Sequence, residues 1–249
     1  MVDTHAHLSA CEPGDGELVD AARAAGVRRV LTVGMDEQSN RAAIAAAEAH
    51  EEVFASVGRH PNSAAGFDPG AEADIERLAA HPKVRAVGET GLEYYRDRAP
   101  RDEQLTAFRA QIDVARRTAL PLVIHMRESA ADTYELLAEQ AAGVTVVLHC
   151  FSAPDRVEEA ASRGWYCSFA GNLTYPNAES LRGAAGAVPD RLLMVETDSP
   201  FLSPQAVRGK PNQPANVVST AATLAELRGL DYADLERLVE ANAAEVFGW

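Results

Sequence analysis

Short apolar runs alternate with longer segments along the whole chain. The runs are four to eight residues long and rich in β-branched or aromatic side chains, and several, such as VTVVLH and LLMVET, are apolar nearly throughout. Continuous apolarity over this length is typical of a strand that is buried on both faces. The pattern predicts strands over residues 2–7, 27–34, 53–58, 84–89, 122–125, 144–149, 165–169 and 192–196.

The intervening segments are rich in alanine and amphipathic at helical spacing. They predict helices near residues 17–25, 37–49, 71–80, 101–118, 130–142, 153–163 and 177–187, followed by two more near 214–228 and 232–247. Eight strands alternating with helices over about 250 residues are typical of a (β/α)8 TIM barrel. We therefore predict an α/β protein: one domain over residues 1–249, a barrel with two additional C-terminal helices.

A doubly wound open sheet is the main alternative fold. Such a sheet normally carries a glycine-rich phosphate-binding turn after its first strand. The corresponding segment here reads HLSACEPGDG, which contains neither G-x-G-x-x-G nor a Walker A sequence. The sequence therefore favours the barrel.

Composition narrows the class of protein. Hydrophobic residues make up 47% and charged residues 24% of the 249 positions, as in globular proteins. Three cysteines, Cys11, Cys150 and Cys167, predict reduced thiols and a cytoplasmic location. No apolar run approaches the ~20 residues of a membrane-spanning helix, so we expect no membrane association.

The formal net charge is −14. This charge argues against broad non-specific binding to duplex DNA or anionic membranes, which requires a basic face. It leaves open an enzyme that grips only the end of a nucleic acid, because metal ions supply positive charge that the sequence does not show. Nothing in the sequence indicates an obligate protein partner.

Catalytic groups of a barrel enzyme lie at the C-terminal ends of its strands. Most histidines of the chain, with two carboxylates, fall at or just after predicted strand ends. These candidates are His5, His7, His60, Glu89, His125, His149 and Asp198.

His5 and His7 lie two positions apart on one strand, so both imidazoles point to the same face and form a natural metal chelate. The alternative is a hydrogen-bonded pair of core histidines. Glu89 closes a buried strand, where a carboxylate is costly unless it is paired or binds a metal. An ion pair with Arg127 is its alternative.

His125 and His149 each end an apolar strand, and each alone would be read as a core histidine. Asp198 follows the last strand, and its alternative is a structural role in a turn or as an N-cap. Glu196 is expected to orient one of the metal ligands without binding the metal itself. Together these side chains are sufficient for two divalent ions ~3.5–4 Å apart, which can activate water and clamp a leaving oxygen. Imidazoles favour zinc, iron, nickel or manganese, and the carboxylates keep magnesium possible.

These motifs, in this order, resemble the TatD family of metal-dependent deoxyribonucleases, which belong to the amidohydrolase-like barrels. The matching stretches cover essentially the whole chain. They are VDTHAHL at 2–8, VGRHPN at 57–62, GETGLEYY at 88–95, LVIHMR at 122–127, VLHCFS at 147–152, VETDSPFL at 195–202, RGKPNQPANV at 208–217 and NAAEVFGW at 242–249.

The resemblance implies a set of metal ligands. His5, His7 and Asp198 are then ligands of a first ion, and Glu89 is the bridging ligand. The remaining two histidines, His125 and His149, are then ligands of a second ion.

The resemblance also implies roles in catalysis and substrate binding. Glu89 and Asp198 are then catalytic, and Asp198 doubles as the general base that orients the attacking water. His60 is expected to contact the substrate or transfer a proton, and Arg127 to meet a phosphate, with a rim ion pair as the alternative for this arginine.

Three positions depart from the family pattern. Glu93 stands where aspartate is usual, Gln213 replaces a glutamate, and Ala153 replaces a glycine, which puts in doubt any positive φ at that position. None of the three is itself a predicted metal ligand.

The activity implied is hydrolysis of nucleic acid by metal-activated water, as a 3′-5′ exonuclease on single-stranded DNA or RNA with Mg, Mn or Zn. Two alternatives remain: a related hydrolase of a small amide, ester or phosphoester, and a non-catalytic barrel that binds nucleic acid or protein. Exposed rings near the rim would favour the nuclease because they stack bases. Tyr94, Tyr95 and Tyr175 are candidates for such rings.

Overall fold

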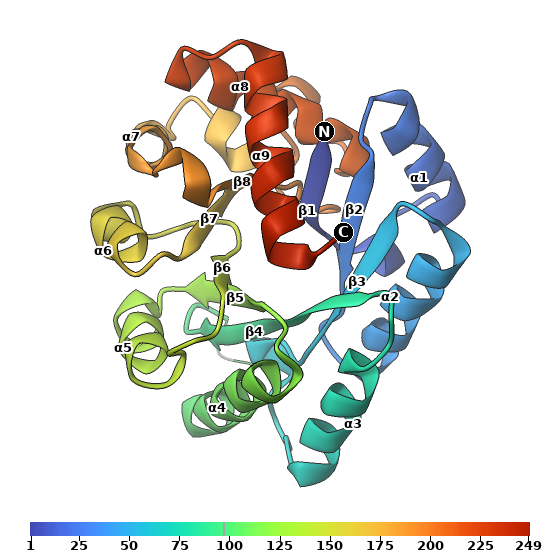
Figure 1. Cartoon of the computed structure of the whole chain (residues 1–249), viewed down its shortest axis with the longest axis vertical. Coiled ribbons are helices and arrows are strands. Elements are labelled where there is room, and N and C mark those ends of the chain that lie inside the picture. The colour runs from blue at the N-terminus through green and yellow to red at the C-terminus, as the bar shows by residue number, and fades with distance from the viewer. Residues whose placement is uncertain (97) are drawn as a thin grey trace.

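In the computed structural model, which describes residues 1–96 and 98–249, eight parallel strands follow one another in sequence order around a nearly closed barrel (Figure 1). Every neighbouring pair is parallel, so all carboxyl ends meet at one rim. The strands are β1 (Val2–Ala6), β2 (Arg29–Val33), β3 (Val53–Val57), β4 (Val84–Glu93), β5 (Leu122–Arg127), β6 (Val146–Leu148), β7 (Tyr166–Phe169) and β8 (Leu193–Val195).

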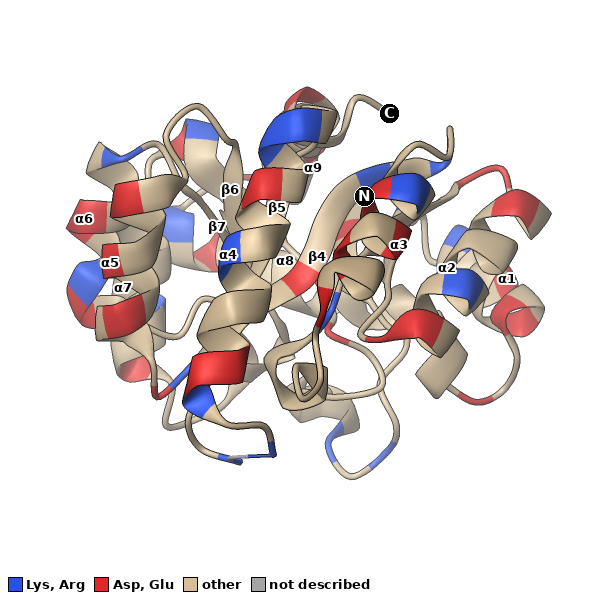
Figure 2. Ribbon diagram, turned by 90° about the horizontal axis from the view of Figure 1, so that it is seen from below, with Lys and Arg blue, Asp and Glu red and all other residues tan. Residues whose placement is uncertain are grey.

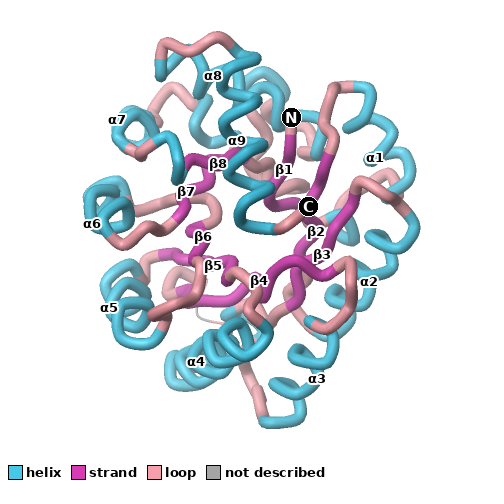
Figure 3. The backbone as a smooth tube through the Cα atoms, viewed as in Figure 1, coloured by secondary structure: helices cyan, strands magenta, loops and turns pink. Residues whose placement is uncertain are grey.

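Helices form an outer ring around these strands (Figure 3). They are α1 (Asp15–Ala24), α2 (Glu37–Ala49), α3 (Pro69–Ala79), α4 (Arg101–Thr118), α5 (Ala130–Gln140), α6 (Val157–Ser162), α7 (Glu179–Ala187), α8 (Val217–Arg228) and α9 (Tyr232–Phe247). α1 to α8 each follow one of the eight strands, which confirms the predicted (β/α)8 barrel. Both predicted C-terminal helices form, but α8 is the eighth helix of this alternation, so only α9 is additional.

The strands are buried on both faces, as continuous apolarity predicts. α9 adds Leu235, Val239, Ala243 and Phe247 to the core at intervals of four residues, the spacing of one helical face. None of the described helices combines the length and apolar character needed to cross a bilayer. Acidic and basic residues intermingle on the outer helices (Figure 2).

Two strands run further than their apolar runs indicate. β4 continues to Glu93 and β5 to Arg127, so Glu89 and His125 lie inside strands, and the prediction that they close them is wrong. The extension is a second stretch of ladder, in which Thr90 pairs with Ile124 and Glu93 with Arg127. The apolar runs do not reveal it, because Thr90, Gly91 and Glu93 interrupt the apolar pattern of β4 and leave only Leu92 as an apolar residue in its extension.

A register shift lies between Val87 and Thr90 and contains Glu89. Such irregularities redirect a side chain, and they are frequent at barrel rims. At Gly88 φ is +140°, and a Cβ there would lie 2.5 Å from the carbonyl oxygen of Val123. The backbone at this position therefore requires glycine.

The barrel closes between β1 and β8 through a few specific bonds. Ala6 and Ser199 form an isolated parallel bridge. The amide of Asp198 donates to the carbonyl of His5 at 2.9 Å, and the amide of His7 donates to that of Ser199 at 2.8 Å. This seam places Asp198 directly beside His5 of β1 and His7, which follows β1.

Candidate metal centre

The seven histidines and carboxylates that the sequence analysis predicted at the strand ends lie together at the C-terminal rim of the barrel. Glu89 is at their centre. Its carboxylate, which is buried, lies within 3.6 Å of an imidazole nitrogen of each of the five histidines. Asp198 lies next to His5 and His7. The described residues contain three groups whose donor atoms fall within 4.8 Å of one another: His5–His149–Glu196, His5–His7–Glu89 and His60–Glu89–His125.

The first set of donors surrounds Oε2 of Glu89. The Nε2 atoms of His5 and His7 are 3.3 Å apart, and each lies 3.5 Å from this oxygen. Oδ1 of Asp198 lies 3.5 Å from Nε2 of His7 and 4.0 Å from that of His5.

These separations fit a cation between the four donors. Ligands at ~2.0–2.2 Å in a tetrahedral site lie about 3.4 Å from one another. Oε2 of Glu89 is buried and has no hydrogen-bond partner among the described residues. A buried carboxylate oxygen without a donor is costly, and a bound cation would remove that cost.

The second set of donors surrounds the other oxygen of Glu89. Oε1 lies 2.7 Å from Nδ1 of His125, 3.0 Å from Nε2 of His149 and 3.6 Å from Nε2 of His60. The two oxygens of one carboxylate therefore face two different sets of imidazoles. A carboxylate in this arrangement can bridge two cations.

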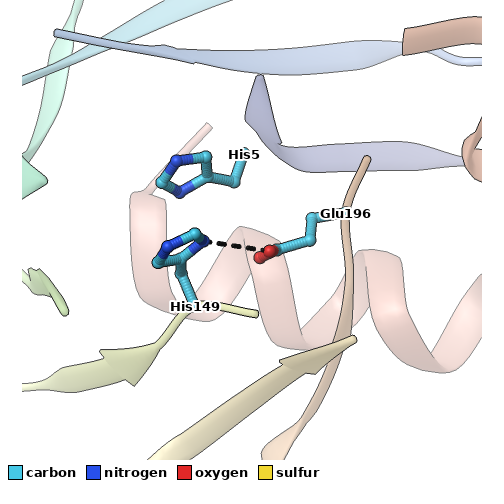
Figure 4. A group of neighbouring side chains, drawn as sticks. All are labelled: His5, His149 and Glu196. Atoms are coloured by element: carbon cyan, nitrogen blue, oxygen red, sulfur yellow. Dashed lines mark hydrogen bonds and ion pairs between the residues drawn. The ribbon is translucent and has the colours of Figure 1, made fainter. Parts of the chain in front are cut away.

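Glu196 holds His149 from behind, as expected of a residue that orients a ligand. Its Oε1 lies 3.0 Å from Nδ1 of His149 (Figure 4). The same oxygen accepts the amide of Cys150 at 2.8 Å. His5 stacks on His149 with ring centroids 3.9 Å apart (Figure 4). The bond at Nδ1 leaves Nε2 of His149 directed at Glu89.

Glu93 contacts His125, a predicted metal ligand. The sequence analysis noted Glu93 only as a departure from the family pattern. Its Oε2 lies 3.2 Å from Nε2 of His125, and its Oε1 accepts the amides of Tyr95 and Arg96. Burial opposes its charge, but the bond to His125 prevails and lowers the pKa of Glu93 to about 2. An ionised carboxylate therefore fixes the ring of His125.

His60 differs from the other histidines in how it is held. Its Nδ1 accepts the amide of Asn62 at 2.9 Å, so the neutral ring carries its proton on Nε2. Burial, reinforced by the nearby His125, lowers the pKa of His60 to about 3. The residue is thus a neutral donor whose N–H points at the cluster.

Strong coupling between charges holds the cluster in an ion-paired state. Burial opposes charge on both partners, yet Glu89 and Glu196 keep the pKa of His149 well above its usual range. Against the same cost of burial, His149 and His60 keep the pKa of Glu89 well below its usual range. The cluster therefore favours a charged imidazole beside a charged carboxylate.

Arg127 and Tyr94 lie at the rim outside the cluster, where their contacts can be compared with the roles predicted for them. Arg127 stacks over the exposed Tyr95 at 4.1 Å from the ring centroid, while Glu89 faces histidines, so the described contacts show no ion pair between Arg127 and Glu89. Tyr94 bonds Asp132 and is covered by Arg101.

Two of the departures from the family pattern also have a defined place. Ala153 has φ −118°, so no positive φ is needed at this position. Gln213 precedes the 3₁₀ turn Pro214–Asn216, and its side chain makes no cap hydrogen bond there.

Three buried polar residues that the sequence analysis missed brace the site. Asp3 accepts the amide and hydroxyl of Thr197 across the β1–β8 seam. Gln104 of α4 bonds both backbone polar groups of Glu93, and Gln111 does the same for Arg59. The two glutamines are seven residues apart on the core-facing side of α4. Their polar side chains on the otherwise apolar face of this predicted helix were the only sequence signal that they bond buried groups.

Histidines and carboxylates gathered at the C-terminal rim of a TIM barrel are typical of metal-dependent hydrolases. The profile of the family described as TatD related DNase matches residues 2–248, and the chain belongs to this family of metal-dependent hydrolases.

Relatives in three bacteria match most of the chain. An uncharacterized metal-dependent hydrolase, TatD, of Mycobacterium tuberculosis is 39% identical, covering 100% of this chain and 98% of the relative. A protein of Cronobacter sakazakii named 3′-5′ ssDNA/RNA exonuclease TatD is 32% identical, covering 93% and 90%. The crystal structure of YjjV, a TatD homolog of Escherichia coli, superposes with a TM-score of 0.93 at 25% identity, covering 100% and 98%.

Proposed function

We propose that this protein is a divalent-metal-dependent phosphodiesterase that removes nucleotides from the 3′ end of single-stranded DNA or RNA. One observation carries the proposal: the two oxygens of Glu89 face two separate sets of imidazoles. The nucleic-acid substrate is supported by the exonuclease named in Cronobacter sakazakii.

The ligands follow from the donor sets. His5, His7 and Asp198 would hold one ion and His125 and His149 a second, with Glu89 shared between them. Carboxylates and imidazoles together suit Mg, Mn or Zn. When bound, such ions lower the pKa of water and neutralise charge on the phosphate.

The residues of the chain supply the remaining chemistry. Asp198 accepts a proton from the attacking water as the water oxygen bonds to phosphorus. The bond to the 3′-oxygen of the preceding nucleotide breaks, and that oxygen takes up a proton from solvent to become a hydroxyl. We expect His60 to donate its Nε2–H to a phosphate oxygen, which the bond of its Nδ1 to the amide of Asn62 supports, and we expect Arg127 to bind a phosphate by charge. The products are a 5′-mononucleotide and a strand shortened by one unit.

We also propose that residues 1–249 form one catalytic domain that works in the cytoplasm. The match of the family profile to residues 2–248 supports the first statement. The second is supported by Cys11, Cys150 and Cys167, which are free thiols, as a reducing compartment would keep them.

The test is digestion of end-labelled single strands by metal-stripped protein that is re-supplied with Mg, Mn or Zn in turn. We expect a ladder that shortens from the 3′ end with at least one metal and no digestion without metal. Asp198→Asn keeps one oxygen but removes the base, so turnover should fall roughly 10²–10⁴-fold while the variant stays folded by circular dichroism. Digestion by metal-free protein, or at the parental rate by this variant, would contradict the mechanism.

A further inference from the structure

A hollow of about 340 Å³ lies at the same rim as the candidate metal centre. Its lining follows the C-terminal ends of β6 and β7 and the first residues of α7. Phe151, Asn172, Tyr175, Asn177 and Leu181 line it. We call it the β6–β7 pocket.

The β6–β7 pocket adjoins the metal centre through two side chains. Nδ2 of Asn172 lies 4.0 Å from Sγ of Cys150. Cys150 directly follows His149, whose Nε2 is 3.0 Å from Glu89. The lining of the pocket therefore begins, with Phe151, two residues after His149 on the same loop.

The lining is uncharged, in contrast to the cluster beside it. All nine of its residues are apolar, aromatic, hydroxyl or amide side chains. Phe151 is buried, and Tyr175 is fixed by its hydroxyl bond to the carbonyl of Ser203 at 3.1 Å and by Arg208, 4.1 Å above its ring. Rigid aromatic walls with amide groups suit a planar heteroaromatic ring and disfavour a phosphate.

Asn172 has unused hydrogen-bonding capacity. Its Oδ1 is buried and has no partner within the described chain, and Nδ2 contacts only the weakly accepting sulfur of Cys150. A buried amide oxygen without a donor is destabilising. Since the amide rotates readily about its last torsion, it can present oxygen or nitrogen to the edge of a ring in the pocket.

We infer that the β6–β7 pocket receives the nucleobase of the 3′-terminal nucleotide, with Asn172 bonding the edge of the base. The inference rests on the proposed nuclease function and names how that site recognises its substrate. The volume is at the lower end of the ~300–1,000 Å³ of small-molecule pockets, which suits one nucleoside.

The first test compares two single strands that differ only in their 3′-terminal unit, a normal nucleotide or an abasic sugar. We expect kcat/KM to be about 10-fold or more higher for the normal terminus, mainly through KM, since this is the usual effect of stacking one base. Equal digestion of both strands by the parent protein would overturn the inference.

Variants then locate the effect. Leu181→Trp fills the pocket and Asn172→Ala removes its amide, so both should bring the ratio between the two strands toward one. Leu227→Trp is the matched control, because Leu227 lies on the exposed side of α8 and should keep the parental ratio. Thermal unfolding checks that the variants fold, and a parental ratio in both pocket variants would overturn the inference.

Binding separates the pocket from the nuclease function. Calorimetric titration with a deoxynucleoside 5′-monophosphate and with deoxyribose 5-phosphate, each with the metal present, measures the contribution of the base without turnover. Tighter binding of the nucleotide that Leu181→Trp abolishes supports the pocket even if no strand is digested, in which case only the nuclease proposal fails. Equal binding of both compounds overturns the pocket.

Discussion

Two histidines next to Glu89 are each oriented by a second carboxylate. Glu93 contacts Nε2 of His125, and Glu196 contacts Nδ1 of His149, so each ring presents its other nitrogen to Glu89. Hydrogen bonds of this kind fix the tautomer and orientation of a ligand.

Glu93→Gln tests this support at His125. The amide keeps the length of the side chain but loses its charge, so metal affinity should fall about 10–100-fold. The measurement is metal content after dialysis against a graded chelator. Glu48→Gln is a matched control, because Glu48 contacts His81 at 3.1 Å on an exposed surface. Equal loss of metal in both variants, or in neither, would contradict the role of Glu93.

The raised pKa of His149 predicts that metal binding releases protons. Below that pKa the metal-free imidazole carries a proton, which a metal must displace, so affinity should fall as the pH is lowered. Calorimetric titration with Mn or Zn near pH 7, in buffers of different ionisation enthalpy, counts the protons. We expect about one or more per protein, and a count near zero from pH 6 to 7 would contradict the ion-paired state.

At the scale of elements, the irregular β4 strand does most to shape the site. Its register shift sets Glu89 at the centre of the histidines, and its extension carries Glu93 to His125. The second stretch of ladder approaches β5 so closely at Gly91 that a Cβ would lie 2.0 Å from the carbonyl oxygen of His125, with φ at +136°.

Gly91→Ala should therefore destabilise the protein by at least about 2 kcal/mol, because it combines a backbone clash with a strained φ. It should also lower metal content by displacing β5. Gly183→Ala on α7 is the control: nothing lies within 4 Å of a Cβ there, and alanine in a helix should stabilise by about 0.5–1 kcal/mol. Urea unfolding of both variants provides the comparison. A free energy of unfolding that Gly91→Ala leaves unchanged would show that β4 and β5 can separate without cost.

At the scale of the whole molecule, the candidate ligands come from β1, β4, β5 and the segments after β6 and β8, which lie far apart in the sequence. Only closure of the barrel brings them together. A cation bound by all of them links these segments and binds the folded state alone, so it should raise the free energy of unfolding.

Metal at 100 times its Kd should stabilise by about 2.7 kcal/mol, which for a chain of this size raises Tm by roughly 5–10 °C. The comparison is thermal unfolding of metal-stripped protein before and after addition of Mn or Zn. Glu89→Ala should show little of this shift, because it removes the shared carboxylate. An identical Tm with and without metal in the parent protein would contradict binding by the folded cluster.

The sequence by itself determined the barrel and its candidate chemistry. Strand and helix periodicities are local properties, and parallel strands that alternate with helices leave few folds to choose from. The same rule places His5, His7, His149 and Asp198 at one rim before any coordinates exist.

Only the tertiary structure decided how these groups meet. The shift at Glu89, the contact of Glu93 with His125 and the β6–β7 pocket depend on the register and spacing of segments far apart in the chain. No local pattern encodes such distances. The buried Asp3 and Gln104 likewise find their partners only once the barrel has closed and α4 has packed, because it is burial that makes their hydrogen bonds necessary.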